Sequence, residues 1–447
     1  MKIANATEQP WPSPVLGWYA TIMLMIAYTF SFVDRQVLNL LVEPIRADLG
    51  LSDTQISFLQ GLAFVGAYVL MSIPIGRLVD RVNRIAVLVG GVVVWSLATV
   101  GCGMANSYSQ LVVARMGVGA GESSVTPSAW SILADYFPRE KLAGPVSVFL
   151  IGPYLGAGIA LIAGAEVIDW SSNMESIAVP LLGEVAPWQF TFIAVGLPGI
   201  LLSLLLLTVP EPKRRGRLAD GETVQRTAPP WPVVIAYMRE HWRIYFAFLV
   251  GMPFVIVLLY GLQAWVPTFL VRVYDWSIPQ AGRVYGTIAL LAGSAGVLSG
   301  PFVARWLSAR GYTDYPLRIP AVAVTLAGLC AVPASLQSNP TIALVLIAGA
   351  SFFVTVPMSL VTAALQTVTP NEMRGVVAGM FVVMGNVIGL ALGPTVVALL
   401  TDRVFADPLA VGKSLSLLFA IIAPLAVLLL VSGMRPFRET IESFDEA

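Results

Sequence analysis

The feature that most constrains this chain is a series of twelve apolar segments, each long enough to cross a bilayer as a helix. Over the whole sequence 57% of residues are hydrophobic and only 12% are charged, which lies far outside the composition of a soluble globular domain. The sequence therefore predicts an all-α polytopic membrane protein with twelve transmembrane helices. The segments are 15–42, 54–76, 85–105, 109–136, 142–168, 188–209, 243–271, 281–307, 316–336, 340–368, 374–401 and 412–433.

The two halves of the chain repeat each other around a polar linker. Residues 75–81 after the second segment resemble residues 299–305 after the eighth, and repeats of six spans are typical of one transporter architecture. We therefore predict a six-helix bundle over residues 1–209, a cytoplasmic linker over 210–240, and a second six-helix bundle over 241–447.

The distribution of basic residues predicts the orientation in the membrane. With both termini inside, nineteen of the 26 Lys and Arg residues fall on inner tails and loops and five on outer loops. We expect both termini in the cytoplasm and a location in a bacterial inner membrane. The net charge is zero, so nothing in the composition indicates a nucleic-acid partner.

Four charged residues lie deep inside the predicted first and fourth spans and form the candidate site. Arg115 and Glu122 in the fourth segment are seven residues apart, which places them on one helix face about 10 Å apart along the axis. Asp34 and Arg35 lie in the first segment, at a similar predicted depth. A charge at membrane depth is costly unless it is paired or hydrated, and these four sum to zero. We interpret Glu122 as a proton-carrying acid that pairs with Arg35 or Arg115. The alternative is a permanent ion pair that only holds helices together.

The loop after the second segment carries a recognisable motif, which reads Gly76-x-Leu78-x-Asp80-Arg81-x-Asn83-Arg84. It resembles the loop motif of the major facilitator superfamily, with Asn83 in place of the usual second glycine. The resemblance implies that Asp80 sits at the N-terminus of the eleventh span and closes the cytoplasmic side. The second copy has Ala304 in place of this acid, so we expect an asymmetric gate. We assign this cytoplasmic gate to Gly76, Asp80, Arg81, Arg84 and Asp135, in which Arg84 and Asp135 form a further ion pair.

A narrower resemblance rests on the charged spans. The segments Phe32-Val33-Asp34-Arg35, Arg115-x-x-x-Gly119-x-Gly121-Glu122-Ser123 and Ala134-Asp135 resemble the Spinster branch of the superfamily. Members of that branch move sphingolipids or lysophospholipids. The resemblance implies an amphiphilic lipid as substrate. Together with the interpretation of Glu122, this predicts a proton-coupled secondary transporter of an amphiphilic lipid that works by alternating access.

The second half offers neutral polar residues among apolar ones, which would suit the chain of an amphiphile. We expect the cavity lining there to be Tyr260, Gln263, Trp265, Ser359, Thr362, Gln366 and Asn386. Two other functions remain open at this stage. One is a proton-coupled carrier of a small polar solute such as an organic anion or a sugar acid, and the other is a membrane-embedded lipid enzyme.

An enzyme is the least favoured of these functions, because the sequence holds one histidine and no nucleophile–base or metal-binding pattern. We expect no cofactor and no metal. The expected partners are the proton, an amphiphilic substrate and the lipid bilayer, and we expect a monomer.

Overall fold

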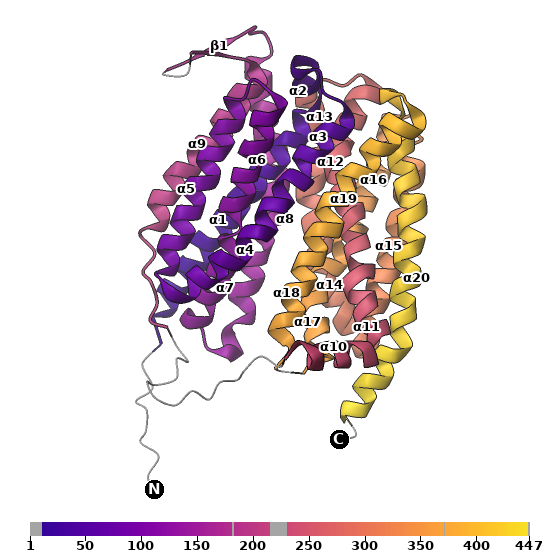
Figure 1. Ribbon diagram of the computed structural model, residues 1–447. Helices are drawn as coiled ribbons and strands as arrows, with labels where there is room; N and C mark the ends of the chain where they lie inside the picture. Colours follow the sequence, from indigo (N-terminus) through magenta and orange to yellow (C-terminus); the bar gives the residue numbers. More distant parts are fainter. Residues whose placement is uncertain (1–10, 181–182, 215–229, 371, 446–447) are drawn as a thin grey trace.

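The computed structural model describes residues 11–180, 183–214, 230–370 and 372–445. Two groups of long helices stand side by side (Figure 1). We call α1–α9 the first half and α10–α20 the second half. The elements of the first half are α1 (Pro14–Leu40), α2 (Val42–Leu49), α3 (Asp53–Gln60), α4 (Leu62–Arg81), α5 (Arg84–Gly103), α6 (Tyr108–Glu122), α7 (Val125–Tyr136), η1 (Arg139–Lys141), α8 (Ala143–Ser171), β1 (Ile177–Val179), β2 (Gly183–Val185) and α9 (Pro187–Leu206). The strands β1 and β2 form a small antiparallel hairpin.

The second half is also helical, and several of its long helices contain π-helical segments. Its elements are α10 (Trp231–Glu240), α11 (Trp242–Phe246), η2 (Ala247–Gly251), α12 (Met252–Tyr274), α13 (Ile278–Ile288), η3 (Ala289–Gly293), α14 (Ser294–Ser308), α15 (Tyr315–Ala334), α16 (Pro340–Thr355), η4 (Val356–Ser359), α17 (Val361–Thr367), α18 (Arg374–Met384), η5 (Gly385–Leu390), α19 (Ala391–Leu399), η6 (Leu400–Phe405), η7 (Pro408–Ala410) and α20 (Val411–Asp445). The helix α10 lies within residues 210–240, which the sequence predicts to be a linker.

The predicted all-α multi-pass fold is confirmed. Among the described residues, eleven helices are long and apolar enough to cross a membrane. The remaining predicted segment, 109–136, is divided into α6 and α7 by a turn at Ser123 and Ser124. This turn follows Glu122 directly, so the candidate acid lies at a bend rather than in a straight helix.

The two ends of the bundle are distinguished by the course of the chain. The helix α1 begins and α20 ends at one end, which we call the terminal end (Figure 1). The hairpin β1–β2 and the short helices α2 and α3 lie at the opposite, distal end. Each long helix connects these two ends, so a residue's position along its helix also gives its depth in the bundle.

Glycines allow the two halves to approach closely along α8 and α13. A Cβ atom added at Gly158 would lie 2.4 Å from Leu290 Cβ and 2.8 Å from the Gly286 carbonyl oxygen. A Cβ atom added at Gly286 would in turn lie 3.0 Å from the Gly158 carbonyl oxygen. Small residues at such crossings let helix backbones come into contact. The two halves are therefore in close backbone contact where α8 crosses α13.

Candidate functional site

The structure brings Arg35 of α1 and Glu122 of α6 together in a buried ion pair. Arg35 Nε donates to Glu122 Oε2 over 2.7 Å, and Nη2 lies 2.5 Å from the same oxygen. The Glu122 side chain is fully buried, and that of Arg35 is 11% exposed. The second carboxylate oxygen, Glu122 Oε1, is buried and has no hydrogen-bond partner in the described part of the chain. An orphaned carboxylate oxygen of this kind is costly as an anion and is a ready acceptor for a proton.

Aromatic rings enclose the guanidinium of Arg35. Its central carbon lies 4.6 Å from the ring centre of Phe32, 4.4 Å from that of Phe64 and 5.7 Å from that of Tyr68. These distances are within the range of cation–π attraction, which strengthens where water is excluded. Tyr260 of α12 packs against the core of the first half, close enough to interact electrostatically with Arg35. Both halves therefore contribute to the surroundings of this cation.

The other two predicted charges are buried beside the pair but have different partners. Arg115 is 1% exposed and donates to two backbone carbonyls, those of Leu59 and Asp34, each over 3.2 Å. Asp34 is 4% exposed, and its carboxylate forms no ion pair with any described residue. Arg115 therefore fixes helices α1 and α3 against α6, and only Arg35 pairs with Glu122.

Toward the distal end, a chain of buried amides links the two halves. Gln263 of α12 accepts a hydrogen bond from Gln36 of α1 over 2.7 Å. Gln36 in turn accepts from Asn39, and Asn39 accepts from Gln60 of α3. This polar chain lies in the interface between the halves, where each buried amide needs a partner.

Further toward the distal end, Arg272 of α12 forms a clamp that the sequence analysis missed. Its Nη1 and Nη2 donate to the two oxygens of Asp53 over 2.6 and 2.7 Å, and its Nε donates to Glu43 over 2.7 Å. The Arg272 side chain is 4% exposed and that of Asp53 is fully buried. Paired donors of this planar kind hold a carboxylate in a fixed orientation. Arg272 is the first charged residue after the predicted seventh span. This position at the end of a span is the feature of the sequence from which the clamp could have been predicted.

Two further polar contacts join the halves at the distal end. The carboxylate of Asp402 accepts from the backbone and the hydroxyl of Thr54, over 2.7 and 2.6 Å. Arg283 pairs with Glu166 and Asp169, but all three side chains are at least 40% exposed, so this contact contributes little. Within the described residues, every ion pair between the halves lies at the distal end.

At the terminal end, the contacts of the predicted gate residues within the described part of the chain lie in the first half and at the beginning of the linker. Arg84 is fully buried and pairs with Asp135 of α7, and its Nε donates to Glu211 over 2.7 Å. Its Nη2 also donates to the Pro212 carbonyl. Arg84 therefore holds the beginning of the linker against α5 and α7, and Glu211 is a partner that the sequence analysis did not identify.

The remaining gate residues lie at the end of α4. Gly76 is half-buried, and the side chains of Asp80 and Arg81 are exposed. The Asp80 carbonyl accepts from Arg214, but no hydrogen bond or ion pair connects Asp80 with α18 in the described part of the chain. The predicted contact between Asp80 and the eleventh span is therefore not formed in this conformation.

The second half has its own ion cluster at the terminal end. Arg318 and Arg438 both donate to Asp314, each over 2.9 Å to the same carboxylate oxygen. Burial raises the pKa of Asp314, but these two hydrogen bonds outweigh it and hold the pKa below its usual value. This cluster connects α15 with α20 and does not reach the first half.

Several of the predicted lining residues of the second half already donate hydrogen bonds to backbone carbonyls of that half. The indole N–H of Trp265 is buried and donates to the Pro394 carbonyl, and Ser359 donates to the Val297 carbonyl. Asn386 donates to the Val382 carbonyl within its own helix. Gln366 is exposed, and the side chain of Thr362 lies outside the described residues. Trp265 was thus wrongly assigned to the cavity, because its ring is fully buried in the core of the second half.

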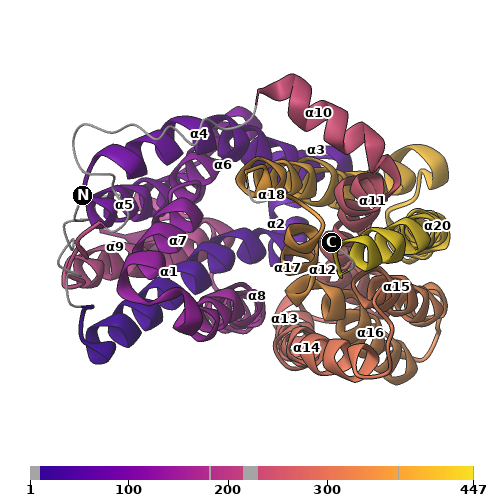
Figure 2. The same cartoon turned by 90° about the horizontal axis from the view of Figure 1, so that it is seen from below.

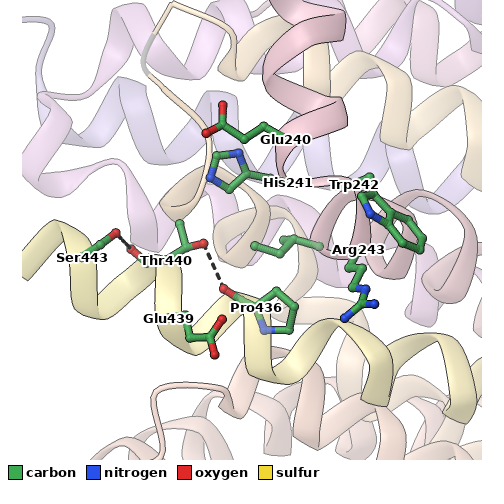
Figure 3. Close-up of a pocket in the computed structure, with 9 residues that line it drawn as sticks. Glu240, His241, Trp242, Arg243, Pro436, Glu439, Thr440 and Ser443 are labelled. Atoms are coloured by element: carbon green, nitrogen blue, oxygen red, sulfur yellow. Dashed lines mark hydrogen bonds between the residues drawn. The ribbon is translucent and has the colours of Figure 1, made fainter.

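A polar pocket of about 320 Å³ lies away from these residues, at the terminal end of the second half (Figure 3). Glu240, His241 and Arg243 line it together with Glu439 and Ser443 of α20. His241 stacks on Tyr237, with the ring centres 4.5 Å apart. None of these residues belongs to the buried charge cluster, so the pocket is not the candidate site.

The sequence matches the Major Facilitator Superfamily over residues 24–394. The chain belongs to this superfamily. It is 29% identical to an MFS-type efflux pump of Mycolicibacterium smegmatis over 91% of this chain and 90% of the relative. It is 25% identical to a D-galactonate transporter of Escherichia coli over 93% of this chain and 95% of the relative.

Among solved structures, a bacterial homologue of the human lysosomal transporter Spinster, in an inward-facing and unoccupied conformation, shares the fold. It has a TM-score of 0.77 and 24% identity, and the match covers 97% of this chain and 99% of that one. The chain therefore has the fold of that Spinster homologue. The chain is a multi-pass membrane transporter of the superfamily and not an enzyme.

We expect the distal end to open when the Arg272 clamp is broken. Replacing Arg272→Gln leaves the Asp53 carboxylate buried without its bidentate partner, which typically costs about 3–5 kcal/mol. The distal end should therefore open in a large fraction of molecules. The shift is measured as a longer distance between spin labels at Ala47 and Leu409, two exposed distal positions. Arg283→Gln, which removes the exposed pair, is the matched control and should leave the distances unchanged. An identical distribution for both variants contradicts the role of the clamp.

Proposed function

We propose that this transporter is proton-coupled and that Glu122 binds the coupling proton. The observation that carries the proposal is the buried ion pair with Arg35, in which one Glu122 oxygen has no partner. Protonation neutralises the carboxylate and weakens its attraction to the guanidinium. Arg35 then becomes available to an anionic group of the substrate, while the rings of Phe32 and Phe64 keep it in place. Loss of the proton restores the pair and displaces the anion.

The alternation between two open states follows from the contacts at the two ends. The polar contacts between the halves lie at the distal end, so this conformation is closed there. We infer that the terminal end is cytoplasmic, because Lys and Arg concentrate in its loops, and that the membrane is a bacterial inner membrane. Opening outward requires the Arg272 clamp to break. Closing inward brings the exposed Asp80 to the N-terminus of α18, where backbone N–H groups favour a carboxylate.

The substrate class that the site supports best is an amphiphile with an anionic head. One buried cation with aromatic walls provides a single anchor, and the polar groups of Trp265, Ser359 and Asn386 are already bound. A sugar acid needs several free donors and acceptors instead. The second candidate is such a polar solute, because one relative is named a D-galactonate transporter and Tyr68 and Tyr260 bring hydroxyl groups near Arg35.

Replacing Glu122→Gln should abolish the response of transport to a pH gradient while the protein still folds. Glutamine keeps the shape and an acceptor for Arg35 but does not bind the proton. The measurement is uptake into liposomes with and without an imposed gradient. Glu166→Gln, which alters an exposed acid in α8, is the control and should behave as the parent protein does. A gradient response that survives in Glu122→Gln excludes Glu122 as the coupling site.

Replacing Asp80→Asn should raise the population that is open at the terminal end. The lost carboxylate–helix interaction is worth about 0.3–2 kcal/mol, so the ratio of open to closed molecules should rise by up to about thirty-fold. Distances between labels on α7 and α17 at the terminal end would report the change. Because the two ends alternate in the proposed mechanism, the distal distances described above should shift in the opposite direction. An unchanged terminal distribution would remove Asp80 from the gate.

Binding should strengthen with chain length across a series of single-chain anionic lipids. Transfer of a methylene from water into an apolar site contributes about 0.8 kcal/mol, or up to about four-fold in affinity. The measurement is competition by each lipid, and by galactonate, in the liposome assay. Flat affinity over the series, or tighter binding of galactonate, would select the polar-solute alternative. If no gradient response exists in the parent protein, proton coupling fails independently of this result.

A further inference from the structure

An apolar groove on the outer rim of the first half is not used by the proposed transport mechanism. It has a volume of about 420 Å³ and lies between α4 and α5, with residues of α6 and the following turn at its floor. Figure 2 shows α4 and α5 at the rim of this half, with α6 beside them. The lining is apolar except for Ser124, whose hydroxyl is bound to the Gly121 carbonyl over 2.9 Å. Leu78 and Val94 on its two walls are 45% and 49% exposed.

The position of the groove identifies the material that fills it. Both walls belong to helices that cross the membrane, so the groove opens onto the hydrocarbon region of the bilayer. Water has no polar partners there, and the acyl chains of lipids are the surrounding solvent. An acyl chain lying along α4 is therefore the occupant that fits these walls.

The mouth of the groove at the terminal end is surrounded by cations. Arg77 and Arg81 are exposed on the last turns of α4, next to Leu78 and Val82 of the groove. Arg214 also lies there, and its Nη2 donates to the Val82 carbonyl over 2.5 Å. Asp80 is the one acid on the same turn of α4. The local charge thus favours an anionic headgroup over a zwitterionic one.

A second feature places this mouth at the level of the headgroups. The helix α10 at the terminal end exposes Trp231 and Ile235, which are 61% and 51% exposed. Exposed aromatic and aliphatic residues on a short surface helix are typical of the membrane interface. The terminal end of α4 therefore lies at the level of the lipid phosphates, and the groove lies at the level of the acyl chains.

We propose that the groove between α4 and α5 is a binding site for an anionic phospholipid, with its acyl chain along α4 and its phosphate near Arg77 and Arg81. The floor of the groove includes Gly121 and Ser124, which flank Glu122 and Ser123. The bound chain thus packs directly behind the turn that carries Glu122. The lipid is a structural partner of the turn, and it is distinct from the transported substrate.

The test is native mass spectrometry of the full chain in detergent, titrated with phosphatidylglycerol or phosphatidylcholine. The parent protein should retain phosphatidylglycerol preferentially. The variant Gly90→Leu fills the groove, where a Cβ atom meets nothing within 4 Å, and it should lose this lipid. The matched control is Gly328→Leu in an apolar groove of about 590 Å³ between α15 and α20, and it should retain the lipid. Equal retention in both variants, or equal loss, would overturn the proposal.

A second variant tests the headgroup without altering the groove. The double substitution Arg77→Gln and Arg81→Gln should reduce the preference for phosphatidylglycerol by up to about thirty-fold, since each basic residue near anionic lipid contributes about five-fold. Binding of phosphatidylcholine should not change. If the preference for phosphatidylglycerol does not change, the headgroup does not bind near Arg77 and Arg81. No step of this test measures transport, so its outcome is independent of the proposed proton coupling.

Discussion

The rest of the site depends on one constraint, which is that a charge inside the membrane must be satisfied by the protein itself. Arg35 is satisfied by Glu122 on one side and by aromatic rings around its plane. Arg115 is satisfied by backbone carbonyls, which are permanent acceptors. Only the first of these arrangements contains a partner that a proton can neutralise. The two arginines are therefore not equivalent, although the sequence places them at similar depth.

The same constraint explains why the two ends of the protein differ. At the distal end, Arg272 and Asp53 are buried by contact between the halves, so their pairing and their burial occur together. At the terminal end, the buried cation Arg84 is satisfied by Asp135 and Glu211, all within the first half and its linker. Separation of the halves therefore leaves the ion pairs of Arg84 intact. The same separation would take Arg272 away from the carboxylate of Asp53. In this conformation the buried ion pairs between the halves are therefore concentrated at the distal end within the described residues.

The sequence was sufficient to predict the fold and the charged residues of the first and fourth spans, because apolar length and buried charge are local properties. It did not predict which arginine pairs with Glu122, since that depends on how α1 rotates against α6. Arg272 was missed because it lies just past an apolar segment, and its partners Glu43 and Asp53 lie on short helices that resemble a loop in the sequence. Trp265 was misassigned because periodicity does not show whether a polar edge faces a cavity or a neighbouring carbonyl. Each error concerns a contact between segments far apart in the chain.

The crossing of α8 and α13 is a second place where the two halves are held together. The backbones at Gly158 and Gly286 are so close that no side chain fits between them, and therefore these helices cannot approach further. The side chains of Leu290 and Ile162 pack onto these two glycines, so the crossing is a close contact between the halves. The buried Arg272 clamp, which resists rotation, lies instead on α12 at the distal end, whereas the exposed Arg283 pair lies on the crossing helices themselves. A bidentate pair tolerates little displacement before its hydrogen bonds break. The glycine crossing thus holds the halves in contact, and the Arg272 clamp holds their distal ends together.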